Sequence, residues 1–466
     1  MRVNPEFRRN VWVQFTWTRL VAAPLLTAIV CYAFLLVTHY DYRMLQSVAE
    51  FVGGSVIVGL WGTRRAADSL AEEVSGGTWE SQRMSGLGAW QMTWGKLIGS
   101  VSFVWYCASI ALLVVLWASN RIEAGDGIGR QPLKVAFDFY VGGMVAQAAA
   151  FSIALLLLRK AAQYRRLTIT LAQSCGFLVF FLFVRGGFWP QASSRFRISD
   201  LPSSDVPWLG GGHDLDLARV AAIGIVCLWS VIGAYRLMRT ELQYRNLPWV
   251  WTLFLVFVLV TGLAASSAET TYGRLALPFM VFVLLTYLSF FADYRDPVRY
   301  RWAFQAVRDR NWFEILSAIP WWVISTLFAA VCAVVIASSL PDGAMLQPTG
   351  PATPALGMFA MALEHFSASL ALVMLFMLRD LLVLLWLSCS PWRAKADVAG
   401  IIYLALVYWP LAAILWVTGG QHLLPVVAPI ATGVAAVDFV PIGIELAFAL
   451  FLFYARWREI TRLKPV

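Results

Sequence analysis

Side chains that commonly carry out chemistry are scarce in this chain of 466 residues. Its four histidines are His39, His213, His365 and His422, and they form no His-Glu-x-x-His motif and no recognisable set with a serine and an acid. The six cysteines show no paired spacing in a loop, which argues against disulfides and cysteine-bound metal. No Gly-x-x-x-x-Gly-Lys-Ser/Thr phosphate loop occurs. We therefore expect no catalysis, no ATP hydrolysis and no bound cofactor or metal in this chain itself.

The few ionisable residues within apolar segments are the next candidates for function. Glu364, His365 and Glu445 lie in such segments. A charge inside a membrane is costly, so a residue of this kind is a functional candidate by default. Two interpretations stay open: these side chains line a substrate path, or they pair between helices, with Arg379 or with a neighbouring backbone. The first would suit an ion- or proton-coupled secondary transporter.

The composition places these residues in a membrane protein. The chain is 60% hydrophobic and 14% charged, whereas soluble domains are about 45–50% apolar and about 25% charged. Several apolar runs reach the roughly 20 residues that a helix needs to cross a bilayer. We expect an all-α polytopic membrane protein. The net charge of +9 is interpreted as a topology signal with some attraction to membrane lipids, and a nucleic-acid partner is excluded.

The apolar runs predict about twelve transmembrane helices in two sets of six. The first set lies near residues 20–38, 48–61, 97–118, 137–158, 168–184 and 220–237. The second set lies near residues 249–266, 275–291, 315–338, 356–378, 399–418 and 435–454. The same layout in both sets predicts an N-terminal half, 1–240, and a C-terminal half, 241–466, as parallel repeats.

Loop charge predicts the orientation of these spans, because Lys and Arg accumulate in cytoplasmic loops. Of the 36 Lys and Arg residues, 26 fall on one side of the predicted spans and eight on the other. Arg219 and Arg379 are interpreted as lying at span edges. We therefore expect a multi-pass protein of the bacterial inner membrane with both termini cytoplasmic. The segment 7–19, which mixes arginines with aromatic residues, is predicted to lie in the membrane interface.

A long charged loop, residues 62–96, interrupts the first set of spans on the cytoplasmic side. Asp68, Glu72 and Glu73 occur at helical spacing in its first part. Gly76 and Gly77 then predict the end of that helix, since glycine favours helix C-termini. Thr78 is a predicted N-cap for a second helix. The loop is thus expected to form helix, turn and helix.

The sequence of this loop resembles the coupling loop of ABC type-2 transporter permeases. The resemblance rests on Leu-Ala-Glu-Glu (70–73), Gly-Thr-Trp-Glu (77–80), Met-Ser-Gly-Leu (84–87), Trp90 and the Gly95-Lys96 pair that leads into a span. The match covers about thirty residues closely, and the six-span layout extends it over the N-terminal half. The proline usual after the family's second helix is absent here, and Gly86 or Gly88 stands in its place.

The resemblance implies an ABC type-2 exporter-like fold with both halves fused in one chain. It implies that the loop docks onto a separate ATP-binding cassette ATPase subunit, present in two copies, which would bind ATP and Mg. The coupling residues implied in the first half are Glu72, Glu73, Gly77, Thr78, Trp79, Glu80, Arg83, Trp90 and Lys96. In the loop 293–314 of the second half they are Arg299, Arg308, Asp309 and Arg310. The chain would then be a permease subunit that forms the path of an amphipathic or hydrophobic substrate. Two alternatives stay open: a merely solvated loop, and a membrane assembly or scaffold protein built on this fold.

Overall fold

The computed structural model places most of the chain in helices that fall into two compact units. It describes residues 4–122, 132–161, 165–185, 215–244, 246–265, 270–293, 297–312, 314–315, 319–339, 365–390 and 396–462. The N-terminal unit comprises Met1–Ser204 and Gly212–Asn246, and the C-terminal unit comprises Leu247–Val466 with Asp205–Gly211. All regular elements within the described residues are helical.

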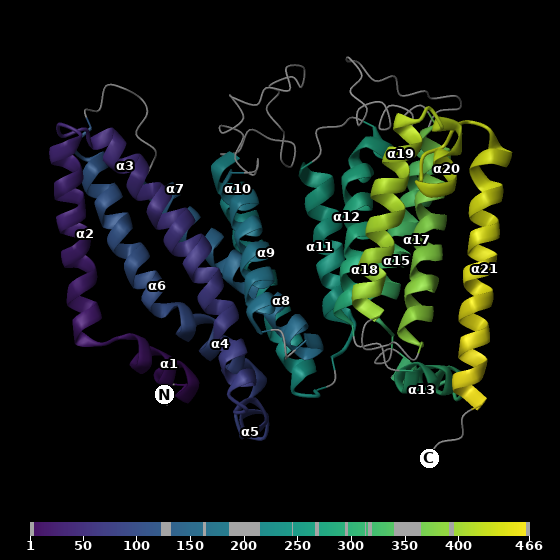
Figure 1. Cartoon of the computed structure of the whole chain (residues 1–466), viewed down its shortest axis with the longest axis horizontal. Coiled ribbons are helices and arrows are strands. Elements are labelled where there is room, and N and C mark those ends of the chain that lie inside the picture. Colours follow the sequence, from purple (N-terminus) through teal and green to yellow (C-terminus); the bar gives the residue numbers. More distant parts are fainter. Residues whose placement is uncertain are drawn as a thin grey trace. The chain divides into compact units, whose positions relative to one another are not determined.

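The N-terminal unit is a bundle built around the large side chains of Leu70, Leu97 and Phe151, all almost fully buried. In the described part of this unit the helices are α1 (Pro5–Gln14), α2 (Trp17–Val37), α3 (Tyr42–Glu50), η1 (Phe51–Gly62), α4 (Thr63–Ser75), α5 (Trp79–Arg83), α6 (Ala89–Ser119), α7 (Pro132–Phe137), η3 (Asp138–Gly142), α8 (Gly143–Ala161), α9 (Arg165–Arg185) and α10 (Leu215–Glu241). Figure 1 shows α1 and α5 at one end of this unit, below its long helices. Those two short helices therefore belong to the end at which the chain starts.

The C-terminal unit has its own core, which includes Phe282, Phe290 and Leu381. In the described part of this unit the helices are α11 (Trp249–Ala265), α12 (Thr271–Ala292), α13 (Pro297–Arg308), α15 (Trp321–Ser339), α17 (Phe366–Ser388), α18 (Ala396–Leu406), η8 (Val407–Leu411), α19 (Ala412–Val417), η9 (Gln421–Leu423), α20 (Leu424–Val427) and α21 (Ala435–Arg462). Helix α13 lies across the end of the long helices near the C-terminus (Figure 1). Within this unit, α12 packs on α15, and α17 packs on α18 and α21.

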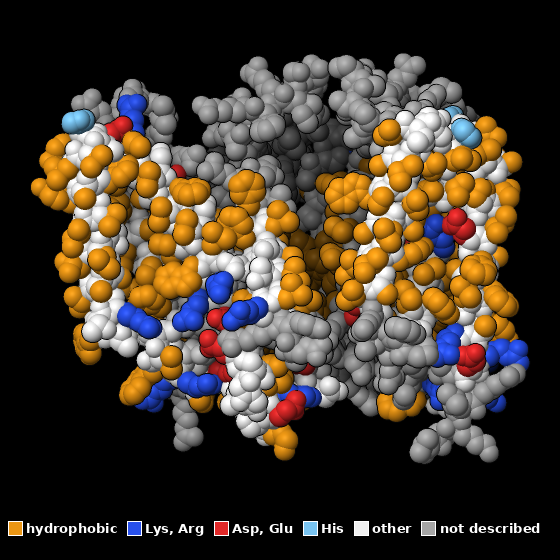
Figure 2. Space-filling model, viewed as in Figure 1, with side chains coloured by type: hydrophobic (Ala, Val, Ile, Leu, Met, Phe, Trp, Pro, Cys, Tyr) orange, Lys and Arg blue, Asp and Glu red, His pale blue; other side chains and the backbone are white. Residues whose placement is uncertain are grey.

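The helices have the length and composition of a multi-pass membrane protein. Among the described residues, ten helices are long and apolar enough to cross a membrane, and two shorter apolar helices, Arg166–Phe181 and Trp249–Ala264, accompany them. The all-helical, membrane-type architecture is thus confirmed, whereas the count of twelve spans stays a prediction. Most large apolar side chains on α2 are exposed, as are several on α12 and α21, and Figure 2 shows an apolar surface over the long helices of each unit.

Two predicted boundaries are wrong. The second span is one continuous helix, Tyr42–Ser75, so the first helix of the predicted loop 62–96 is an extension of that span. The span predicted at 356–378 is α17, Phe366–Ser388. Arg379 therefore lies inside this helix rather than at a span edge. A buried ion-pair network, described below, is what allows this arginine within an apolar helix.

The middle of the long helix Tyr42–Ser75 is η1, which has π-helical geometry and four glycines. A Cβ atom at Gly53 would come within 2.6 Å of the Phe139 ring, and one at Gly62 within 2.4 Å of the Gln147 amide. These two positions exclude any larger residue unless a neighbour moves. Small residues at such contacts let membrane helices approach closely. The direction in which α4 continues from η1 therefore depends on these glycines.

Candidate functional site

Helix α1 is fixed along the start of α6 by a row of polar side chains, whose acceptor carbonyls on α6 lie four and five residues apart. The Asn4 amide donates to the Gln91 carbonyl at 2.6 Å, and Asn10 donates to the Gly95 carbonyl at 3.3 Å. Gln14 donates to the Ser100 carbonyl at 2.7 Å. The close approach depends on Gly95, where a Cβ would lie 2.9 Å from the Asn4 amide nitrogen. Helices α1 and α6 thus form one packed pair.

Lys96 of α6 joins this pair to the charged loop. Its side chain is almost fully buried, and its three ammonium protons have three acceptors. The Nζ atom lies 3.0 Å from Glu6 Oε1 of α1 and 2.8 Å from Gln82 Oε1 of α5, and it also pairs with Glu73 Oε2 of α4. It stands 5.8 Å from the centre of the Trp79 ring, a cation–π distance. One lysine therefore contacts side chains from α1, α4 and α5.

The carboxylates around Lys96 are balanced by a second cation. Glu73 accepts from Gln82 Nε2 at 2.8 Å and from Arg9 Nη1 at 3.2 Å, and Arg9 also lies 3.6 Å from Glu6. We call Glu6, Arg9, Glu73, Trp79, Gln82 and Lys96 the Lys96 cluster. Its two carboxylates and two cations sum to zero charge. Because its carboxylates and ammonium group are buried and paired, separating them would leave a costly uncompensated charge.

The turn between α4 and α5 has the predicted glycine end, but the predicted cap at Thr78 is wrong. Gly77 adopts φ +68°, the left-handed conformation that glycine favours after a helix C-terminus. Thr78 occupies the N-cap position of α5, but its hydroxyl donates back to the Glu73 carbonyl at 3.3 Å. The hydroxyl thus closes the turn instead of capping α5. The end of the first helix at Gly76 and Gly77 is confirmed.

The predicted coupling residues of the first half separate into an internal and an exposed group. Glu73, Trp79 and Lys96 are buried in the Lys96 cluster and have little surface to offer another subunit. The exposed or half-exposed members are Glu72, Gly77, Thr78, Glu80, Arg83 and Trp90. The Trp90 ring also packs edge-on against Tyr235 at 5.4 Å between centroids. Contact with a partner can therefore involve the tip of the α4–α5 hairpin, where the Met84 side chain is 87% exposed.

The C-terminal unit contains a second buried ionic network, inside its apolar helices. Asp380, fully buried on α17, accepts from its neighbour Arg379 at 2.7 and 3.0 Å. It also accepts from the hydroxyls of Tyr287 at 2.8 Å, Tyr403 at 3.1 Å and Tyr408 at 2.6 Å. Arg379 reaches Glu445 of α21 at 2.5 Å and stacks over the Phe376 ring at 4.4 Å.

We call Tyr287, Arg379, Asp380, Tyr403, Tyr408 and Glu445 the Arg379 cluster. It holds two carboxylates and one guanidinium group, a formal charge of −1. The Glu445 side chain is 34% exposed, and Figure 2 shows a blue and red pair within the apolar surface of this unit. The cluster thus has one carboxylate in excess, and Glu445 is its partly exposed carboxylate.

The predicted residues of the second half have mixed outcomes. The ion pair between Glu445 and Arg379 is present, whereas Glu364 lies outside the described residues. His365 takes the N-cap position of α17, and its ring packs against Gly433, away from the Arg379 cluster. Arg308, Asp309 and Arg310 are exposed at the end of α13, and Arg299 belongs to the same helix. The two halves therefore present different charged segments.

Sequence reasoning missed Asp380 and its three tyrosines, and also the part played by Glu6. One signal was available: Arg379-Asp380 interrupts an apolar run that continues to residue 388. Among the described residues, no group of three or more His, Cys, Asp or Glu side chains could hold a metal ion. Comparison with protein-family models, curated proteins and solved structures found no match to this chain. The functional interpretation therefore rests on the geometry of its residues.

Proposed function

We propose that this chain is the permease subunit of an ATP-binding cassette exporter of type 2, working with a separate ATPase subunit in the bacterial inner membrane. The observation that carries the proposal is the α4–α5 hairpin, which is exposed at its tip and joined by the buried Lys96 cluster to α1 and α6. A docking loop needs both properties. The tip must meet a partner, and its base must transmit the displacement.

The exposed tip has the chemistry of a docking surface. Glu72 and Glu80 offer carboxylates for charge-assisted hydrogen bonds to Arg or Lys of another protein. Met84 and Trp90 offer adaptable and aromatic contacts of the type enriched at interfaces. Glu80 is held by Arg83 at 3.1 Å, three residues along the same helix. The partner is thus expected to present basic groups around an apolar recess.

The base of the hairpin is suited to moving as one body with two long helices. Glu73 lies in the last turn of the helix Tyr42–Ser75, and Lys96 lies near the start of α6. These two residues form a buried ion pair, and Gln82 of α5 hydrogen-bonds to both of them, so a displaced α5 would pull on both helices. Closure of the ATPase subunits would then rearrange the substrate path of an amphipathic or hydrophobic molecule.

The test is purification of the tagged full-length chain from its own membranes, followed by measurement of associated ATPase activity. We expect an ATP-binding subunit to co-purify with the wild type and to be lost from a Glu80→Lys variant. Glu459→Lys is the matched control, because Glu459 is 63% exposed and also pairs with an arginine three residues away. Absence of any ATP-binding subunit from the wild type, together with ATP-independent transport, would refute the proposal.

An ion- or proton-coupled secondary transporter is the second candidate, and the Arg379 cluster favours it. Ionisable groups deep in apolar helices are typical of proton and ion pathways. Under this alternative, transport into proteoliposomes would collapse with an ionophore and with Glu445→Gln, without any need for ATP. Under the exporter proposal, transport would require ATP and would survive the ionophore.

A further inference from the structure

Helices α2 and α6 meet along a single seam within the N-terminal unit. On α6, Phe103, Tyr106, Ile110, Val114 and Trp117 recur every three or four residues and so share one face. Helix α2 packs poorly against the rest of the unit, since Leu35 is its one buried residue. Two cavities follow one another along this seam, an apolar one and a cationic one. The apolar cavity could take an acyl chain and the cationic cavity the anionic head group of a lipid.

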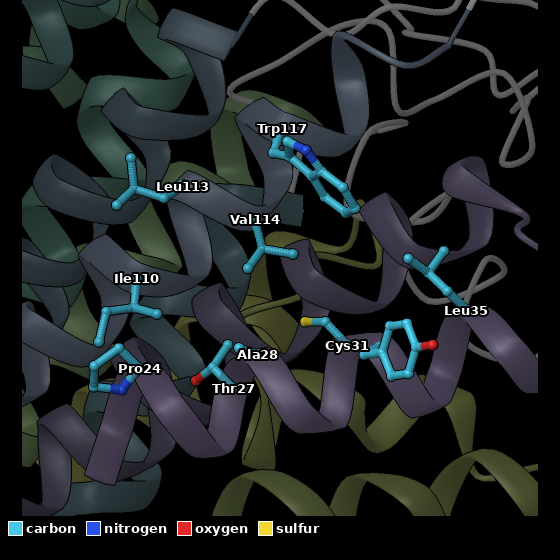
Figure 3. Close-up of a pocket in the computed structure, with 10 residues that line it drawn as sticks. Pro24, Thr27, Ala28, Cys31, Leu35, Ile110, Leu113, Val114 and Trp117 are labelled. Atoms are coloured by element: carbon cyan, nitrogen blue, oxygen red, sulfur yellow. The ribbon is translucent and has the colours of Figure 1, made fainter. Parts of the chain in front are cut away.

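The apolar cavity lies between the middle and the far end of both helices and measures about 340 Å³. Figure 3 shows Pro24 and Ile110 at one end of it, and Leu35 and Trp117 at the other. The Thr27 hydroxyl at its wall donates to the Ala23 carbonyl of its own helix at 2.9 Å, so its proton needs no acceptor from a ligand. The distance from residue 24 to residue 35 is about 16 Å by helical rise. One leaflet of a hydrocarbon core is about 15 Å deep, so a single acyl chain matches the length of this groove.

The cationic cavity lies at the charged end of the same seam and measures about 450 Å³. Arg19, Arg64 and Arg65 line it, with Asp68 as its one carboxylate. Arg19 donates to the Gln14 carbonyl at 3.4 Å. Within the described part of the chain, neither Arg64 nor Arg65 makes a hydrogen bond or ion pair. Three guanidinium groups against one carboxylate give a site of charge +2, and guanidinium groups bind phosphate in a bidentate manner.

Between the two cavities, the Tyr106 hydroxyl donates to the Leu20 carbonyl at 2.8 Å, and the Phe15 ring packs edge-on against Phe103 and Tyr106. Leu20 lies four residues before Pro24, which has no N–H to donate to it. The tyrosine thus replaces the missing helix bond and fixes α2 to α6 at this level. Phe103 lies below the bond and Ile110 above it on the same face of α6. The cationic and apolar cavities therefore lie along the same face of α6, one before and one after this bond.

We propose that this seam binds one anionic glycerophospholipid. Its phosphate lies between Arg19, Arg64 and Arg65, and one acyl chain follows α2 and α6 as far as Trp117. The lipid supplies the packing that α2 lacks from the protein, and it neutralises the surplus positive charge beside α4. This binding is independent of whether the chain exports with an ATPase or works as a secondary transporter.

The test is native mass spectrometry of the full-length chain in detergent, titrated with phosphatidylglycerol, phosphatidylcholine or inorganic phosphate. We expect the wild type to bind one phosphatidylglycerol at least tenfold more tightly than Arg64→Gln with Arg65→Gln. The matched control is Arg8→Gln with Arg166→Gln, which removes two exposed charges of the same unit outside the cavity and should leave the affinity unchanged. Filling the groove with Ala28→Trp should weaken both lipids at least tenfold. Ala28 is exposed, so the variant should keep its fold, checked by gel filtration.

Three results would overturn the proposal. Equal loss in both arginine pairs would indicate diffuse attraction by the charged end. Displacement of the lipid by an equal concentration of phosphate would indicate a free-anion site. Unchanged lipid affinity in Ala28→Trp would show that no acyl chain occupies the groove.

Discussion

Replacing Lys96 by methionine should be among the most damaging single substitutions at the charged end of the N-terminal unit. Methionine keeps most of the volume but removes the cation from between Glu6 and Glu73, whose side chains are 6% and 9% exposed. Removing one member of a buried ion pair costs about 3–5 kcal/mol, because the remaining charge has neither water nor partner. Arg9 would still lie near both carboxylates, but its side chain is 56% exposed, and such screened pairs contribute only about 0–1 kcal/mol.

We therefore expect Lys96→Met to lower the free energy of unfolding by about 3–5 kcal/mol. The measurement is reversible unfolding of the full-length chain in mixed micelles with SDS. Neutralising the carboxylates as well, in Glu6→Gln with Glu73→Gln and Lys96→Met, should restore most of the loss, because no unpaired charge would then stay buried. Arg83→Met is the surface control, since it breaks the exposed pair with Glu80 and should cost about 0–1 kcal/mol. If Lys96→Met costs no more than Arg83→Met, or if the triple variant is less stable than Lys96→Met, the burial argument is wrong.

Two further substitutions test single structural features. Gly77→Ala should destabilise the α4–α5 turn by about 1–2 kcal/mol because residue 77 has φ +68°, whereas Gly86→Ala, at a residue without a positive φ and with open space around it, should cost far less. The SDS unfolding assay checks this pair, and equal costs would contradict the strain argument. Arg379→Leu should cost about 3–5 kcal/mol by leaving Asp380 without a cation, and Asp380→Leu added to it should recover part of that loss. A double variant less stable than Arg379→Leu would show that the pair itself, rather than the uncompensated buried charge of Asp380, determines the cost.

The features predicted correctly from the sequence are those determined by neighbouring residues. The helical architecture follows from the lengths of apolar runs, and the turn at Gly77 follows from the preference of glycine for a left-handed conformation. The extent of the span around Arg379 could not be predicted in the same way. Hydropathy counts each charge as unpaired, whereas Arg379 is paired with Asp380 beside it and with Glu445, which lies 66 residues further along the chain. The second boundary error, at residue 62, arose because a helix can leave the apolar layer and continue.

The contacts that define the Lys96 cluster are equally remote in sequence. Lys96 meets Glu6 across 90 residues and Glu73 across 23, and no periodicity relates these positions. The sequence could indicate that Glu73 and Lys96 belong to a functional loop. It could not show that their charges neutralise each other inside that loop. Because Glu73 and Lys96 are buried, they support the loop from within, whereas Glu72, Glu80 and Met84 are exposed.

The two ionic clusters differ in a way that bears on the choice between the proposed functions. The Lys96 cluster has equal numbers of positive and negative charges, and each of the three ammonium protons of Lys96 has an acceptor. Uptake of a proton or cation would therefore leave this buried cluster with an unbalanced charge. Such a cluster suits a rigid joint that transmits movement. The Arg379 cluster has one carboxylate in excess, and Glu445 is the member that is partly exposed. A joint of the first kind fits the ATP-driven exporter proposed above, whereas an ionisable site of the second kind would fit ion coupling. Because the hairpin has an exposed tip and a fixed base, its geometry supports the exporter, and the Arg379 cluster is then explained as packing between α17, α18 and α21.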